Sequence, residues 1–210
     1  MSSQRIGNSV VPPLAVALLL GATGPALGQT PAAPRQPEPR AIVRVYNFAN
    51  VPPDTLERAI SEAARAFEKT GVELQWSVVQ PPTEKDSGRA PEPPRSLPVY
   101  QMSLMPESTA RMVRVPEHVF GIAQGSQADV FAYRAELEAR QWSPLPYPVY
   151  LGYLMAHEVG HLLLGGNRHS LSGIMSSRLS RRELQQACQG LLQFSPAEAG
   201  QMRSALCQTR

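Results

Sequence analysis

Two histidines four residues apart, with a glutamate next to the first, are the residues best suited to chemistry in this chain. They lie in the run His157-Glu158-Val159-Gly160-His161. On a helix, residues four apart are separated by about 40° round the axis and about 6 Å along it, so both imidazoles can reach one metal ion. A zinc ion bound in this way would lower the pKa of its water to about 7, and the adjacent Glu158 could take the proton. The pattern therefore predicts hydrolysis by a zinc-bound water.

A third protein ligand is expected, because a catalytic zinc site has three protein ligands and one open position. Two candidates follow the motif: His169, and Glu183, which is 22 residues beyond His161. Glu183 is also the fourth residue of a capping box that begins at Ser180, where it would bind the N-terminus of its own helix. We therefore favour His169, while Glu183 stays open as an alternative. The fourth histidine, His118, is expected on a strand edge and is not taken as a ligand.

A buried helix has to carry the motif. Residues 148–164 are apolar nearly all round, begin with a proline and are followed by two glycines, which brackets a helix. A helix that is apolar on every side is buried. Two imidazoles and a carboxylate would be costly to bury there without a metal, so this context supports the metal-binding interpretation.

The residues before this helix predict strands and one further helix. Residues 41–48 are rich in β-formers, residues 54–69 have apolar positions at helical spacing, and residues 72–78 alternate apolar and polar side chains. A strand, a helix and a strand with short connections predict a parallel crossover. Further strands are expected over residues 97–104, 119–123 and 128–133, after a proline-rich loop over 80–98.

Two more helices are predicted after the motif, opened by capping boxes at Ser180 and Ser195. Each carries one of the two cysteines, Cys188 and Cys207. An even pair of cysteines in an exported protein predicts a disulfide, which here would join the two helices.

Three segments are expected along the 210 residues. Residues 1–28 have a basic start, a short apolar run and small residues before the end, which is typical of a cleaved secretory signal. Residues 29–40 are a disordered proline-rich linker, and residues 41–210 are enough for one catalytic domain. We expect a periplasmic or extracellular protein with no stable membrane anchor after signal removal. The net charge is +3, but the basic residues are scattered and do not form a stripe, which argues against nucleic-acid binding.

The run HEVGHLLLGGNRHSLSGIM, residues 157–175, resembles the zinc-binding region of the metzincin metalloproteases, especially the matrixin-like members. The resemblance implies an α+β, zincin-like fold with a twisted mixed sheet, a buried zinc-binding helix and a C-terminal helical pair. It also implies a role for each matching residue. These are the Zn²⁺ ligands His157, His161 and His169, the base Glu158, the turn residue Gly165 and the apolar floor Met175.

The chain departs from the family pattern at one place. The family has five residues between its second and third histidines, whereas residues 162–168 make seven here. A helix longer by one residue, followed by a wider turn through residues 165–167, could absorb the difference, because Gly and Asn tolerate positive φ. The family also binds extended peptide along an edge strand ahead of the zinc helix, and residues 119–124 are the counterpart here.

Two functions follow as hypotheses. The first is an exported zinc metalloendopeptidase that cleaves peptide or protein substrates. The second is an exported, non-catalytic zinc-binding or interaction domain on a metzincin-like scaffold, which the expanded spacing before His169 motivates. Glu158 argues against the second, because a purely structural site needs no carboxylate at that place.

Overall fold

The computed structural model describes residues 39–79, 97–141 and 145–208. The expected signal over 1–28, nearly all of the expected linker and most of the proline-rich loop lie outside the described residues. Within them, the fold is a mixed α+β domain with one five-stranded sheet and six helices.

The sheet is parallel except at one edge. Its order is β2-β1-β3-β5-β4, and only β4 runs antiparallel to its neighbour. The predicted parallel pairing of the first two strands is confirmed, with Val43 opposite Trp76. The strands are β1 (Arg40–Asn47), β2 (Glu73–Val79), β3 (Val99–Met105), β4 (Gly121–Gln124) and β5 (Gln127–Phe131).

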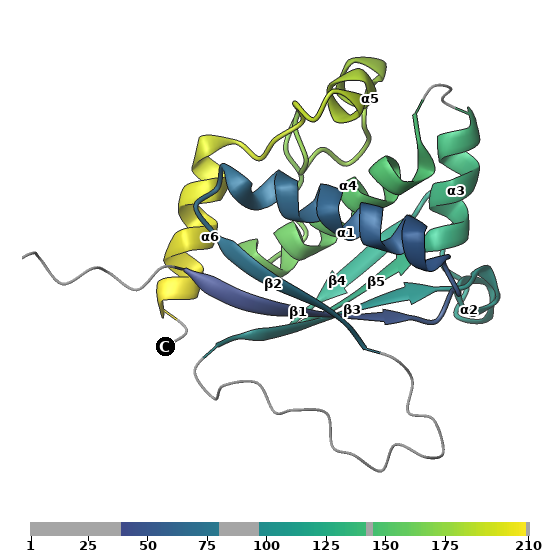
Figure 1. Cartoon of the computed structure of the whole chain (residues 1–210), viewed down its shortest axis with the longest axis horizontal. Coiled ribbons are helices and arrows are strands. Elements are labelled where there is room, and N and C mark those ends of the chain that lie inside the picture. The colour runs from purple at the N-terminus through teal and green to yellow at the C-terminus, as the bar shows by residue number, and fades with distance from the viewer. Residues whose placement is uncertain (1–38, 80–96, 142–144, 209–210) are drawn as a thin grey trace, which may run out of the picture. The chain divides into compact units, whose positions relative to one another are not determined.

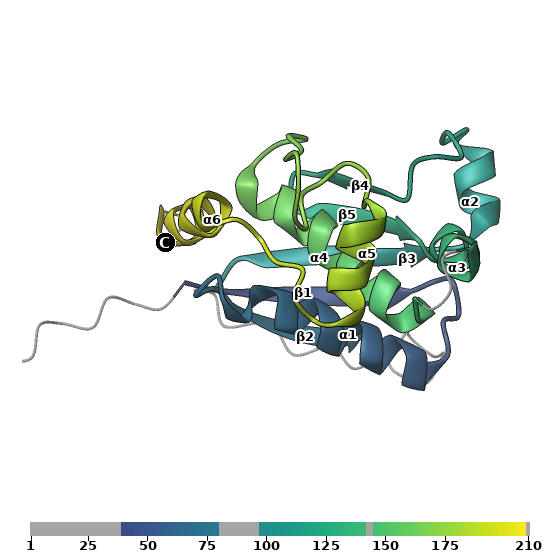
Figure 2. The ribbon, with the colours of Figure 1, turned by 90° about the horizontal axis from the view of Figure 1, so that it is seen from above.

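The helices α1 (Pro53–Glu68) and α4 (Tyr147–Leu164) lie side by side over one face of the sheet (Figures 1 and 2). They approach each other closely at Gly152. A Cβ added at Gly152 of α4 would lie 2.6 Å from the carbonyl oxygen of Ala59 in α1. The other described helices are α2 (Glu107–Met112), α3 (Ala132–Gln141), α5 (Arg181–Cys188) and α6 (Pro196–Gln208).

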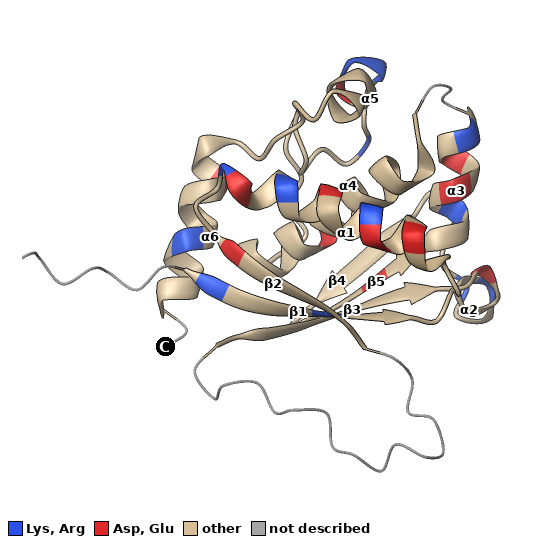
Figure 3. Ribbon diagram, viewed as in Figure 1, with Lys and Arg blue, Asp and Glu red and all other residues tan. Residues whose placement is uncertain are grey.

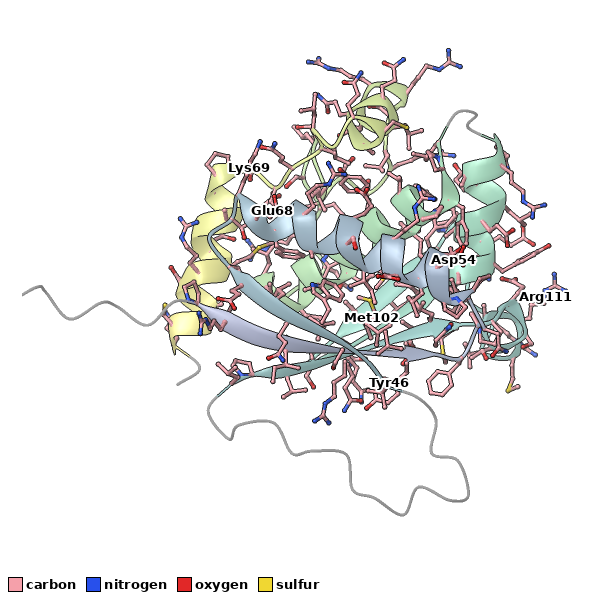
Figure 4. The ribbon with its side chains drawn as sticks, viewed as in Figure 1. Tyr46, Asp54, Glu68, Lys69, Met102 and Arg111 are labelled. Atoms are coloured by element: carbon pink, nitrogen blue, oxygen red, sulfur yellow. The ribbon has the colours of Figure 1, made fainter. Side chains whose placement is uncertain are left out.

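The apolar core lies between the sheet and these two helices. Met102 is fully buried there, whereas Tyr46 lies on the opposite face of the sheet (Figure 4). This is the alternation that strand geometry imposes. Charged side chains are spread over α1, α3 and α5 (Figure 3), whereas Glu158 is the one Asp, Glu, Lys or Arg residue of α4. The expectation of a buried, apolar helix is therefore confirmed, and none of the described helices is both long and apolar enough to cross a bilayer.

Two helices were not expected from the sequence. α3 follows β5 without a loop, so residues 128–133 divide between a strand that ends at Phe131 and a helix that starts at Ala132. No glycine, proline or capping residue marks this change, and the pattern alone extends the strand too far. α2 is a short helix between Pro106 and Val113.

The expected disulfide is wrong. Cys188 and Cys207 are both free and exposed. A disulfide needs Cα atoms within about 7 Å of each other. Cys188 ends α5, but Cys207 lies eleven residues beyond the start of α6, about 16 Å along that helix. The two helices also point in different directions and lie apart (Figures 1 and 2).

Candidate metal centre

The three histidines of the extended motif come together at the C-terminal half of α4. His157 and His161 lie one turn apart on the helix, and His169 lies on the loop that follows it. One ligand atom from each ring lies within 4.8 Å of the other two. Among the described residues, this is the group of His, Cys, Asp and Glu side chains suited to hold a metal ion.

Backbone carbonyls orient the two helical imidazoles. Nδ1 of His157 donates to the Ile174 carbonyl at 2.7 Å, and Nδ1 of His161 donates to the Gly166 carbonyl at 2.9 Å. Both Nε2 atoms are then left with lone pairs, and they face each other at 3.0 Å. Two lone pairs at that distance repel unless a proton or a cation lies between them. The donor set therefore fits a metal ion, with the carbonyls as the outer partners that metal-binding histidines usually have.

Burial keeps these rings neutral. It lowers the pKa of His157 to about 4, with smaller contributions from the neighbouring histidines. Burial also lowers the pKa of His161. A neutral imidazole is the form that coordinates metal, so both rings are ready to bind at neutral pH.

Gly165 and Gly166 form the turn that ends α4. The helix runs to Leu164, and Gly165 takes the left-handed conformation with φ 72° and ψ 42°. The amides of Gly165 and Gly166 both donate to the carbonyl of His161, at 3.0 and 3.4 Å. The same turn brings the Gly166 carbonyl to the His161 ring, so it positions a histidine as well as ending the helix.

Met175 packs against α4 next to the motif. Its side chain is fully buried, and a Cβ added at Gly160 would lie 2.4 Å from its sulfur. Glycine at this position allows the sulfur to reach the helix backbone, one residue before His161.

Glu158 lies between α4 and the edge strand β4. It is 5% exposed, and a Cβ added at Gly121 of β4 would lie 2.3 Å from its Oε1. Burial, and secondly the charge of Asp129, raise its pKa to about 8. A carboxyl group with this pKa can both accept and release a proton near neutral pH.

A cleft of about 840 Å³ joins these groups to the surface. Glu158 and the three histidines line it, together with residues 117–123, which include the first three residues of β4. Tyr150 and Leu154, from the preceding turns of α4, form an apolar part of the wall. His118 also lines the cleft but does not belong to the three-histidine group.

The alternative ligand, Glu183, lies elsewhere. Its Oε2 accepts from the amide and the hydroxyl of Ser180 at 2.8 and 2.7 Å, which completes the predicted capping box. Its Oε1 accepts from the amide of Gly173 at 2.8 Å. Both oxygens are thus occupied by protein donors, and the third histidine takes the place at the cluster.

The sequence showed no sign of the role of Arg134. This α3 residue is 7% exposed and is ion-paired to Glu107, with its Nε 3.0 Å from Oε2. Its guanidinium also donates to the Val115 carbonyl at 3.2 Å, to the Val119 carbonyl at 2.8 Å and to the Pro116 carbonyl. Arg134 thereby holds the segment that leads into β4, and this segment forms one rim of the cleft. These contacts span 15 or more residues of sequence, so no local pattern could reveal them.

No family model matches the chain, and no curated protein matches it. Among solved structures, the chain is similar to the crystal structure of archaemetzincin (amzA) from Methanopyrus kandleri, with 17% identity and a TM-score of 0.46. The similarity covers 82% of this chain and 98% of that chain.

Proposed function

We propose that this chain is a zinc-dependent endopeptidase with a metzincin-like catalytic domain. The observation that carries the proposal is the convergence of three imidazoles beside a buried carboxylate, in a cleft bordered by an edge strand. His157, His161 and His169 would hold the ion. When bound, zinc would lower the pKa of a coordinated water to about 7 and polarise the substrate carbonyl.

Glu158 is proposed as the general base. Its burial raises its pKa to about 8 in the metal-free protein, and a nearby cation would lower this value and favour the carboxylate. The carboxylate would accept a proton from water and later release it to the leaving amine. The contact with Gly121 holds the side chain on the β4 side of α4, within the cleft.

Strand β4 is proposed to bind the substrate backbone. It is one of the two edge strands of the sheet and has no strand partner on its outer side among the described residues. An extended peptide can add to such an edge by main-chain hydrogen bonds. The peptide would then run through the cleft past Glu158 and the histidines. We also propose export to a periplasm or the cell exterior, which the composition of residues 1–28 supports.

The test is Glu158→Gln, which keeps the shape of the side chain but removes the base. The variant should bind one zinc per chain and lose activity on an unfolded, casein-type substrate by at least about 100-fold, within the range for general-base catalysis. Glu117→Gln is the matched control, because Glu117 lines the same cleft but is exposed. Unchanged activity in Glu158→Gln would refute the mechanism. Wild-type protein that binds zinc but cleaves no peptide in a wide library would instead support the non-catalytic scaffold.

A further inference from the structure

The loop from Ser170 to Met175 connects the third histidine to the buried methionine. It closes on itself, since the amide of Ser170 donates to the Met175 carbonyl at 2.8 Å. It begins directly after His169, and it supplies the Ile174 carbonyl to which His157 donates at 2.7 Å. The position of this loop therefore sets two of the three imidazoles.

One contact to this loop comes from the start of α6. Glu198 is 7% exposed and uses one carboxylate oxygen for its own helix, where Oε2 accepts from the Ser195 amide at 2.7 Å. The other oxygen, Oε1, accepts from the hydroxyl of Ser170, 28 residues away in sequence. A residue that only capped its helix would have no need of the second contact.

A matching contact comes from the start of α5. Glu183 is also 7% exposed and also divides its carboxylate, with Oε2 on Ser180 and Oε1 on the amide of Gly173 at 2.8 Å. Gly173 has φ 86°, and a Cβ there would lie 2.7 Å from the carbonyl oxygen of Gln193. Glycine thus lets the loop approach the connection between α5 and α6. The amide of Ile174 also donates to Gln193, at 3.1 Å.

We propose that Glu183 and Glu198 are positioning residues of the metal centre, and that each combines a helix cap with a clamp on the loop of residues 170–175. The inference rests on the proposed zinc site. The N-terminus of α5 holds the loop at Gly173, and the N-terminus of α6 holds it at Ser170. The loop in turn orients His157 through the Ile174 carbonyl, and it fixes His169 because Ser170 directly follows that residue. The Ile174 carbonyl, which this loop carries, is the outer-shell partner of His157, and such partners are typically worth 10- to 100-fold in metal affinity.

Substitutions at two serines distinguish the contact of Glu198 with the loop from its role as a helix cap. Ser170→Ala removes the hydroxyl that binds Glu198 and leaves the α6 cap in place. Ser195→Ala removes the hydroxyl that accepts from the Glu198 amide at 3.3 Å and leaves the bond to Ser170. Zinc affinity is measured by competition with a chromogenic chelator, and thermal unfolding of the zinc-free proteins is measured in parallel.

We expect Ser170→Ala to weaken zinc binding by about 10-fold or more and to speed zinc release. Ser195→Ala should lower the melting temperature but keep zinc affinity within about twofold of wild type. Ser170→Thr keeps a hydroxyl and should restore affinity, which separates the clamp from general loss of packing. Equal zinc affinity in Ser170→Ala and wild type overturns the positioning role of Glu198 and leaves the proposed function standing, as does an equal loss in both alanine variants. Wild-type protein that binds no zinc overturns the proposed function and the positioning role together.

Discussion

Gly121 gives a direct test of how closely the sheet edge holds the proposed base. Alanine at this position would place its Cβ 2.3 Å from Oε1 of Glu158, 2.5 Å from Cδ and 2.7 Å from Cγ. Ordinary contact begins at 3.4 Å, so the carboxylate would have to move by about 1 Å. A misplacement of this size can cost about 100-fold in rate, equivalent to about 2.7 kcal/mol in the activation free energy.

The loss should appear in kcat and not in zinc content. The three nearest atoms to the added Cβ all belong to Glu158, and none belongs to a histidine. Gly121→Ala should therefore bind one zinc per chain while kcat on a casein-type substrate falls about 100-fold. Gly200→Ala is the control, because its nearest atom, on Arg203, is 3.8 Å away. A Gly121→Ala enzyme with kcat within about threefold of wild type would show that the position of Glu158 against β4 does not matter, contrary to the reasoning above.

Three further predictions concern the same region. Glu158 binds its proton more tightly in the folded state, since its pKa rises from 4.5 to about 8, so zinc-free wild type should lose stability as pH rises through this window. Glu158→Gln should not show this loss. Its free energy of unfolding in urea, taken relative to wild type, should therefore be higher by a few kcal/mol at about pH 9 than at about pH 6, and parallel pH profiles would contradict this. His169→Ala should lose stoichiometric zinc in metal analysis, whereas Glu183→Ala should keep one zinc with lower affinity, and the reverse result would make Glu183 the ligand. Arg134→Lys cannot reproduce a guanidinium that binds several carbonyls, so it should raise KM for long peptides more than it lowers kcat and leave zinc content unchanged; an unchanged KM would rule out its role at the cleft rim.

Local spacing explains why so much of the site could be predicted from the sequence. The pair His157 and His161 is adjacent on any helix, because the backbone geometry brings residues four apart onto one face. The capping boxes at Ser180 and Ser195 are local for the same reason, and both are present. The strand, helix and strand at the start of the domain followed from apolar periodicity, and their bounds agree to within one or two residues.

Contacts between distant residues could not be predicted in this way. The sequence left two candidates for the third ligand. Only the folded loop brings His169 to the cluster, and the amide of Gly173 in the same loop donates to the Glu183 carboxylate. The prediction of a disulfide was wrong because the sequence shows which helices carry the cysteines but not how far apart those helices lie.

The sequence by itself determined the chemistry of the centre, namely which side chains can bind a metal and which can move a proton. The tertiary structure decided how that centre is held: Gly121 against the proposed base, Arg134 on the cleft rim and Glu198 on the loop. The reason is physical. Helix geometry relates neighbours in sequence through fixed backbone bonds, whereas these supports join segments whose separation is set only when the whole core packs.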